Sequence, residues 1–302
     1  MRQFIRFLGL SLMPGILLIV LAGSVAAQTA PKMRTRYFTA LTNIEVENYL
    51  QRNDLIFIPV GTVQAHGVLP VDCEYVAAEA LALKMAEETD GLVFPHMQFT
   101  YPGDGAIGRG TIAISPAEGL AYLKVIARSL LRQGFNRQIY VTSHASAAPL
   151  TVSPLVLEFF YESRNPVLYL HGEILLRRVN ADLNKVLFGA YSIVGRLEDI
   201  PVNLTPEIPE LGTNEGLRKL QALGSSFSAR NGTIGFFRVE DKEAPTGKAV
   251  TAEQRAAWAK EGTAMIEAAI KAGDMKKIVQ SLLDHQRFTR EYLIPKYDGL
   301  LP

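Results

Sequence analysis

The sequence comprises 302 residues, of which 48% are hydrophobic, with 31 Lys and Arg against 30 Asp and Glu and a formal net charge of +1 at pH 7. This balance gives no electrostatic case for binding to nucleic acid or to an anionic membrane surface. Cys73 is the single cysteine, so no internal disulfide is available and we expect packing to stabilise the fold.

The first 27 residues have the layout of a secretory signal peptide. Arg2 and Arg6 precede an apolar run over residues 8–21, and a stretch of small residues ends at Ala27. We predict cleavage after Ala27 and an exported protein, periplasmic or secreted, in which residues 28–302 form one domain. An uncleaved membrane anchor is the alternative, although the apolar run is short for a span.

Strand and helix signals alternate along the rest of the chain. Short apolar runs predict strands at residues 55–60, 92–94, 111–114, 138–141, 167–170 and 233–237. Helical patterns predict helices at residues 42–51, 75–88, 115–133, 150–162, 173–187, 215–223, 251–272 and 275–287. Residues 188–212 carry few signals, so we expect a long connection that serves as a lid or an interface segment. This alternation predicts an α/β fold, a three-layer α/β/α sandwich with a mostly parallel sheet.

Two of the predicted helices begin at capping boxes, in which a Ser or Thr is followed three residues later by Glu or Gln. Ser115 with Glu118 forms the first pattern, and Thr251 with Gln254 forms the second. Trp258, on the long helix that follows, is expected to lie in the core or at a subunit interface.

Two of the predicted strands are followed by a histidine. The strand at 55–60 leads to His66, and the strand at 138–141 leads to His144. Parallel strands end at the same edge of a sheet, so neighbouring strands would bring both imidazoles close to Glu74. Two His and one carboxylate are a common catalytic zinc set, and a metal-activated water hydrolyses amides. The residues alone leave open the alternative that His66 caps a loop and His144 is bonded in the core.

Residues 61–67, Gly-Thr-Val-Gln-Ala-His-Gly, resemble the first motif of the creatininase family of creatinine amidohydrolase-like proteins, which reads Gly-Ser/Thr-x-Glu-Gln/Ala-His-Gly. Residues 108–115, 142–147 and 232–235 are similar to three later motifs, which read Gly-x-Pro-Gly-Thr-Ile-x-Leu-Ser, Asn-Gly-His-Gly-Gly-Asn and Gly-x-Ile-Gly. The motifs occur in the family's order over about residues 55–270.

The resemblance implies a metal-dependent hydrolase of an amide, cyclic amide or formamide C–N bond in a small molecule. It also implies a dinuclear divalent metal site at the carboxyl edge of the sheet and a homo-oligomer. His66 and His144 retain two ligand positions of the family, and Glu74 stands at the position of the bridging Asp. The last ligand of the family, a Glu, matches Glu215, with Glu173 as a competing candidate.

Two departures from the family pattern bear on activity. Gln64 replaces the Glu of the first motif, and a neutral amide is a poor substitute for a carboxylate ligand. Residues 145–147, Ala-Ser-Ala, replace Gly-Gly-Asn and add side chains where backbone usually approaches the substrate. We therefore expect one ion rather than two, held by His66, Glu74 and His144, or no ion at all. Zinc is the first choice, with manganese and iron as alternatives.

Other polar residues complete the predicted site. Gln64 is expected to orient the water or the substrate, and Glu215 is the second candidate for a catalytic role. The candidate substrate contacts are Asp104, Arg109, Ser143 and Ser146. The leading hypothesis is an exported amidohydrolase with a small-molecule amide substrate, with no nucleic-acid partner and no membrane association after signal cleavage. The competing hypothesis is a catalytically degenerate member that binds a small molecule or serves as a structural subunit.

Overall fold

A computed structural model describes residues 33–102, 110–143, 148–204 and 250–301. The predicted signal peptide at 1–27, the helix at 215–223 and the strand at 233–237 lie outside these residues. Among the described helices, none combines the length and the apolar character that a membrane crossing requires.

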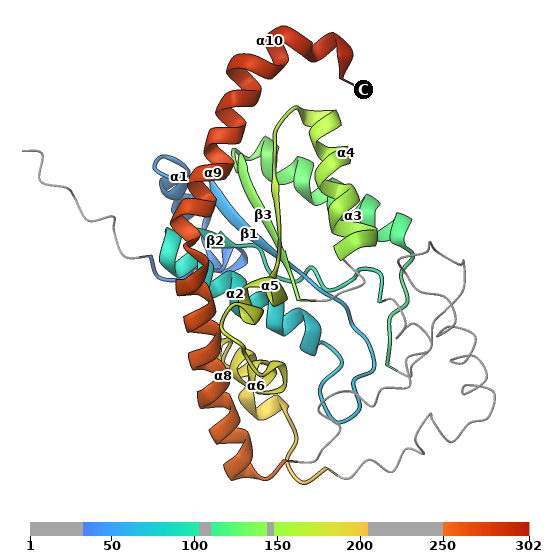
Figure 1. The fold of residues 1–302 in the computed structure, drawn as a ribbon, viewed down its shortest axis with the longest axis vertical. Coiled ribbons are helices and arrows are strands. Elements are labelled where there is room, and N and C mark those ends of the chain that lie inside the picture. The colour runs from blue at the N-terminus through green and yellow to red at the C-terminus, as the bar shows by residue number, and fades with distance from the viewer. Residues whose placement is uncertain (1–32, 103–109, 144–147, 205–249, 302) are drawn as a thin grey trace, which may run out of the picture. The chain divides into compact units, whose positions relative to one another are not determined.

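The centre of the described chain is a sheet of four parallel strands in the order β2-β1-β3-β4 (Figure 1). The strands are β1 (Leu55–Val60), β2 (Leu92–Val93), β3 (Arg137–Thr142) and β4 (Leu168–His171). β1 and β3 are neighbours in register from Leu55 and Arg137 to Val60 and Thr142. The carboxyl ends of these two strands therefore lie side by side.

Helices pack on both faces of the sheet, which confirms the predicted α/β fold. Their bounds are α1 (Asn43–Leu50), α2 (Cys73–Thr89), α3 (Pro116–Arg132), α4 (Ser153–Ser163), α5 (Gly172–Arg177), α6 (Leu183–Ile193), α8 (Ala252–Gly273), α9 (Met275–Phe288) and α10 (Ile294–Tyr297). Shorter helical turns are η1 (Phe38–Ala40), η3 (Ala148–Val152), η4 (Leu197–Asp199), η7 (Thr289–Leu293) and η8 (Asp298–Leu300). Both predicted capping boxes form, at the starts of α3 and α8.

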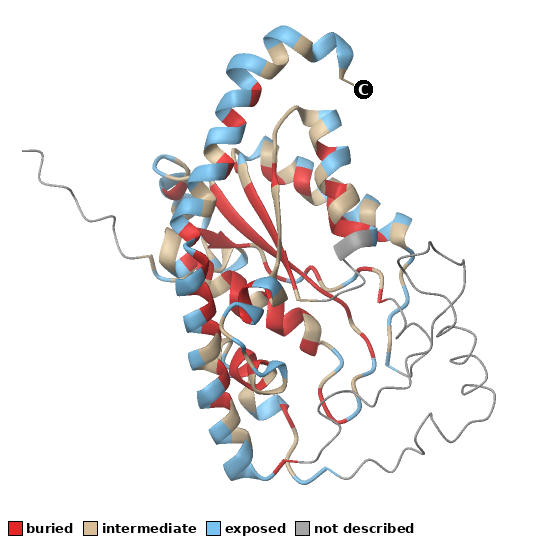
Figure 2. Cartoon of the chain, viewed as in Figure 1, coloured by how far each residue is buried: buried red, intermediate tan, exposed pale blue. Residues whose placement is uncertain are grey.

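The main core lies between one face of the sheet and helices α2, α6 and α8. Phe57 of β1 and Val141 of β3 point into it, and both are fully buried. Figure 2 shows the strands and the inner sides of these helices as buried. On the other face, buried Gln138 donates hydrogen bonds from Nε2 to the carbonyls of Ala127 in α3 and of Phe135. The sheet is therefore covered by helices on both sides, as a parallel sheet requires.

Helices α6 and α8 approach each other at a pair of glycines. A Cβ atom added to Gly262 would lie 1.8 Å from the carbonyl oxygen of Lys185, and one added to Gly189 would lie 2.2 Å from the carbonyl carbon of Gly262. Next to this contact the rings of Phe188 and Trp258 meet edge to face, with centroids 5.1 Å apart. Trp258 thus packs against the core, as predicted.

Two predicted elements are wrong. Residues 111–114 form no strand; Ile112 donates one backbone hydrogen bond to Val63 and its side chain is 47% exposed. The predicted helix at 173–187 is two helices, because Asn180 adopts a left-handed conformation with φ 51° and Asp182 caps a new helix. The expected connection from residue 188 is therefore helical up to Ile193.

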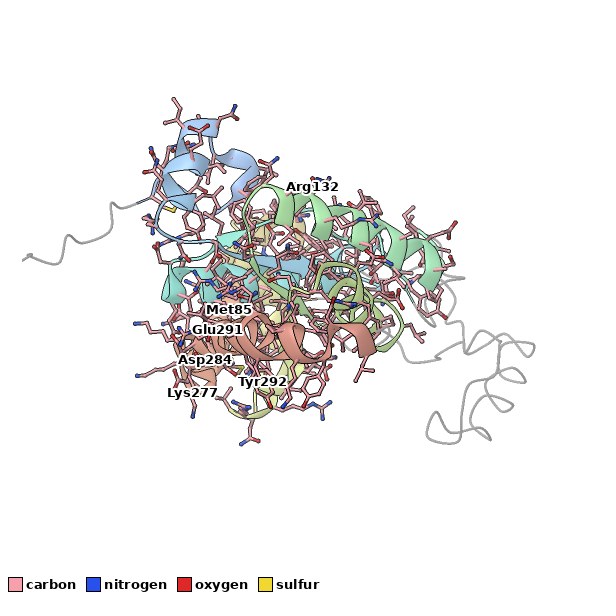
Figure 3. All side chains as sticks on the ribbon, turned by 90° about the horizontal axis from the view of Figure 1, so that it is seen from above. Met85, Arg132, Lys277, Asp284, Glu291 and Tyr292 are labelled. Carbon is pink, nitrogen blue, oxygen red and sulfur yellow. The ribbon has the colours of Figure 1, made fainter. Side chains whose placement is uncertain are left out.

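The C-terminal helices are polar on the side that faces away from the core. In Figure 3 the labelled side chains of Lys277, Asp284 and Tyr292 lie along this side, and all three are exposed. His285 on α9 is exposed as well.

Candidate active site

Polar side chains gather where the strands end. β1 leads into the loop that carries Gln64 and His66, β3 leads to Ser143, and β4 ends at His171. Thr142 and His171 are register partners, so the ends of β3 and β4 are adjacent. The carboxyl edge of a parallel α/β sheet is where such folds bind ligands.

The loop after β1 is held in place mainly through its backbone. Gln64 donates from its backbone N–H to the carbonyl of Val71 at 2.8 Å, and Leu69 donates to the carbonyl of His66 at 3.2 Å. Gly67 allows the turn because its φ of 63° lies in the left-handed region. Gly61 is required for a different reason: a Cβ atom there would lie 2.4 Å from the Cα atom of Tyr75 in α2.

His66 and Glu74 face each other at the start of α2. Nε2 of His66 lies 3.5 Å from Oε1 of Glu74, and their side chains are only 12% and 22% exposed. Burial lowers the pKa of His66 to about 4. Burial, with a smaller contribution from the charge of Glu173, raises the pKa of Glu74 to about 7. The imidazole is therefore neutral at pH 7 and the carboxyl group is close to its midpoint.

Gln64 contacts the same imidazole. Its Nε2 lies 2.9 Å from Nε2 of His66. Because an amide nitrogen only donates, His66 Nε2 accepts this bond and the ring carries its proton on Nδ1. The lone pair of His66 is therefore directed toward both the Gln64 amide and the Glu74 carboxyl group.

Besides Oγ1 of Thr62 in the loop after β1, three side-chain atoms at this edge are buried without a hydrogen-bond partner among the described residues. They are Oε1 of Gln64, Oη of Tyr169 and Nδ1 of His171. A buried polar group left without a partner costs about 1–3 kcal/mol. The rings of Tyr169 and His171 lie on the same face of β4 with centroids 6.3 Å apart. Such atoms mark positions where a ligand or a bound water can supply the missing bond.

Ser143 connects the ends of two elements. Its Oγ donates a hydrogen bond to the carbonyl oxygen of Glu74 at 2.8 Å. This bond ties the residue after β3 to the first turn of α2. The predicted substrate contact Ser143 is therefore engaged with the backbone as a donor, and its oxygen keeps capacity to accept a bond.

Two of the predicted metal ligands lie among the described residues and face each other. His66 and Glu74 supply an imidazole nitrogen and a carboxylate oxygen 3.5 Å apart, and Gln64 Oε1 is a further buried oxygen on the same loop. Within the described ranges, no three His, Cys, Asp or Glu side chains are grouped so that they could hold a metal ion. His144, the predicted third ligand, lies outside the described residues.

The remaining predicted site residues divide into two groups. Those outside the described residues are Asp104, Arg109, Ser146 and Glu215. Glu173 lies in the first turn of α5, where it accepts a hydrogen bond from Arg177 at 3.1 Å. His171 and Tyr169 were missed as candidate site residues. The signal that selected His66 and His144, a strand followed by a histidine, would have selected His171 as well.

Comparisons with known proteins agree with this architecture. Residues 39–162 match the creatininase family model, described as creatinine amidohydrolase. A crystal structure of creatinine amidohydrolase (creatininase) is 18% identical with a TM-score of 0.55, over 83% of this chain and 99% of that one. A structure titled "Creatininase Mn" is 18% identical with a TM-score of 0.51, over 84% and 99%. A mutant creatininase complexed with creatine is 17% identical with a TM-score of 0.51, over 82% and 99%. None of the curated proteins gives a match. The structural likenesses establish the shared fold.

Proposed function

We propose, from the premise that this chain is a distant member of the creatininase family, that it is an exported, metal-dependent hydrolase of an amide, cyclic amide or formamide C–N bond in a small molecule. The observation that carries the proposal is the pair His66 and Glu74, whose Nε2 and Oε1 atoms face each other at 3.5 Å on the carboxyl edge of the sheet. A neutral imidazole nitrogen and a carboxylate oxygen are both acceptors, so they need a cation or a proton between them.

His66 and Glu74 are the residues that would hold the ion, with His144 as the proposed third ligand. A divalent cation, zinc first, would lower the pKa of a bound water and polarise a carbonyl group. Manganese fits the same donors, and a creatininase structure of this fold is titled with that metal.

Each remaining side chain has a task that follows from its hydrogen-bonding groups. The amide of Gln64 can orient the attacking water or the substrate, because its Oε1 is buried and accepts no bond from the described residues. Tyr169 and His171 offer an unpartnered hydroxyl and an unpartnered ring nitrogen for polar groups of the substrate. Glu215, Asp104, Arg109 and Ser146 are proposed to complete the site.

The metal-free site is expected to disfavour an anionic ligand. Glu74 and Glu173 place two carboxyl groups near each other, and the charge of Glu173 raises the pKa of Glu74. A further anion would be repelled at this position. A creatininase of the same fold is complexed with creatine, which motivates testing creatinine and simple lactams first.

Metal dependence tests the proposal directly. Full-length protein is purified, its metal content is measured, and its melting temperature is recorded with chelator and with added Zn²⁺ or Mn²⁺. A ligand that binds only the folded state at 100 times its dissociation constant stabilises it by about 2.7 kcal/mol. We expect this stabilisation in the natural protein, its loss in H66Q, and its retention in H285Q, a change of the exposed histidine on α9. Absence of metal-dependent stabilisation and of amide hydrolysis would reject the proposal.

The competing function is that of a small-molecule-binding protein without catalysis. It is favoured by one observation, the 2.9 Å contact of Gln64 Nε2 with His66 Nε2, which occupies the lone pair that a metal would use. If only Q64E hydrolyses amides, while the natural protein binds them unchanged, the binding function is the correct one.

A further inference from the structure

We infer that Asp72 is a positioning residue for Glu74, held from outside the site by Tyr191 and Arg196. We call these three side chains the Asp72 clamp. The inference rests on the proposed function, because it concerns the geometry of the pair His66 and Glu74, and it adds a residue to which no metal or substrate contact is assigned.

Asp72 occupies the N-cap position of α2 and does not cap the helix. Its backbone, with φ −100° and ψ 10°, lacks the extended conformation of a cap, and its side chain accepts no bond from the first turn. Asp is among the residues that normally accept such a bond. The carboxylate is instead used elsewhere.

Both oxygens of Asp72 bind residues that are distant in the sequence. Oδ1 accepts a hydrogen bond from the hydroxyl of Tyr191 at 2.7 Å, and Oδ2 accepts one from Nη1 of Arg196 at 2.7 Å. A hydrogen bond with a charged partner is roughly twice as strong as a neutral one. The clamp therefore replaces one charge-assisted cap with two charge-assisted side-chain bonds.

The partners of Asp72 are themselves fixed. Tyr191 is fully buried in α6, and the guanidinium carbon of Arg196 lies 5.5 Å from the centroid of its ring. Nε of Arg196 donates to Oδ2 of Asp199 at 2.7 Å. A long side chain held at three points is a rigid anchor, since its rotamers are already restricted.

The consequence falls on Glu74, two residues further along the chain. Its own backbone carbonyl is bound by Ser143, so the clamp and this bond hold the first turn of α2 from two sides. An uncapped first turn would otherwise be free to fray, because its N–H groups have no partners within the helix. The positions of metal ligands have to be kept within about 0.5 Å. A small shift of Asp72 is therefore expected to move Glu74 far enough to weaken metal binding.

A similar ion pair at the opposite edge of the sheet provides a matched control. Asp54 and Arg137 form a partly buried carboxylate–guanidinium pair beside the amino ends of β1 and β3. The side chain of Asp54 is 27% exposed and that of Asp72 is 24% exposed. Loss of either carboxylate should weaken the fold, but only Asp72 is connected to Glu74.

The test compares D72N, R196M and D54N in the full-length protein. Two quantities are measured besides the melting temperature: the dissociation constant for Zn²⁺ by competition with a chromophoric chelator, and the ¹⁵N and ¹³C shifts of the His66 imidazole in metal-free protein. Loss of a residue that orients a ligand typically weakens metal binding by about 10–100-fold. We expect this weakening and shifted His66 signals in D72N and R196M, intermediate values in R196K, and natural values for both quantities in D54N.

The outcomes separate the two ideas. If the natural protein binds no Zn²⁺, the proposed function fails, and the His66 signals alone decide on the clamp. Unchanged His66 signals in D72N, or equal changes in D72N and D54N, overturn the positioning role. If D72N does not fold, R196K gives the same comparison with the charge retained.

Discussion

The hydroxyl of Ser143 donates a hydrogen bond to the backbone carbonyl of Glu74 at 2.8 Å. It thereby joins the end of β3 to the start of α2, two points that are 69 positions apart in the sequence. The loop that follows β1 carries His66, whose side chain faces Glu74 at the start of the same helix. The candidate site thus lies where two neighbouring strands end beside the start of one helix, and the Ser143 side chain links the second strand to that helix.

Replacing Ser143 by alanine should loosen this junction. We expect S143A to lose about 1 kcal/mol of unfolding free energy, the usual net worth of one hydrogen bond, and to bind divalent metal more weakly. S163A is the matched control, because Ser163 Oγ also donates to a backbone carbonyl, that of Phe159 at 2.6 Å, away from the strand ends. Equal losses of metal affinity in both variants would contradict the prediction. Urea unfolding and metal titration measure the two effects.

Restoring a carboxylate at position 64 should favour a cation. In Q64E the new charge joins Glu74 around His66, so we expect at least tenfold tighter binding of Zn²⁺ or Mn²⁺. Without metal, the same variant should be less stable than the natural protein, because a second buried carboxylate is added without a partner. Melting temperatures with and without metal test both halves, and a variant that is stabilised in chelator would contradict this reasoning.

The buried hydroxyl of Tyr169 should lower the unfolding free energy of the protein. Its hydroxyl is buried and has no hydrogen-bond partner among the described residues, so Y169F is expected to raise the unfolding free energy by about 1 kcal/mol. If the hydroxyl serves the substrate, the same change weakens substrate binding. Tyr140 is the control: it lies opposite Tyr169 in the sheet, but its hydroxyl donates to Gln138 at 2.8 Å. Y140F should therefore destabilise the protein, and a destabilised Y169F would oppose the prediction.

Glu79 should make the metal-free fold less stable as the pH rises. Burial raises the pKa of its carboxyl group above the ordinary value of 4.5, although hydrogen bonds from Tyr37 and Tyr75 oppose the shift. A folded state with the higher pKa holds its proton more tightly, so this contribution is complete below pH 4.5 and is lost as the pH rises through the folded pKa.

The comparison of E79Q with the natural protein isolates this contribution. Both proteins keep Glu74, whose raised pKa acts in the same direction, so the difference between their stability curves belongs to Glu79. We expect the advantage of E79Q to grow from pH 4.5 towards pH 8 in urea unfolding. A constant difference would show that Glu79 does not titrate in this range. E291Q, a change of an exposed carboxylate on η7, serves as the control.

The glycine contact between α6 and α8 predicts a large effect of a small change. An added Cβ atom on Gly262 would overlap the backbone of Lys185, so G262A must separate the helices. Overpacking in a core typically costs about 1–3 kcal/mol and sometimes more. G299A is the control, because a Cβ atom there meets nothing within 4 Å. Thermal unfolding of both variants measures the difference, and an unaffected G262A would show that the helices can move apart freely.

Local patterns in the sequence predicted most of the fold. The apolar run 55–60 is β1, and both capping boxes start helices, because these features depend on neighbours within a few residues. The false strand at 111–114 shows the limit of propensity: β-branched residues do not reveal whether a partner strand is within reach. The break at Asn180 was overlooked although the sequence marks it: Asn is a common residue at a left-handed helix end, and Asp182 is a typical N-cap.

The site was predictable only in part. Parallel strands place their ends together, and this rule predicted that His66 and His144 would meet there near Glu74. The structure brings His66 and Glu74 together, and His144 lies outside the described residues. The bond between Asp72 and Arg196 joins positions 124 residues apart, and no local pattern marks it. Such contacts are decided by how helices pack, and packing becomes known only with the structure.

The close contact between α6 and α8 also fixes the position of Tyr191. Because the backbones of α6 and α8 touch at Gly189 and Gly262, Tyr191 in α6 cannot shift without moving α8 as well. Asp72 accepts a hydrogen bond from Tyr191. The positions of Asp72 and of the first turn of α2 therefore depend on α8, a helix that begins more than 170 residues downstream. Substitutions along α8 that touch no polar group are therefore expected to alter the chemistry of the candidate site at the start of α2.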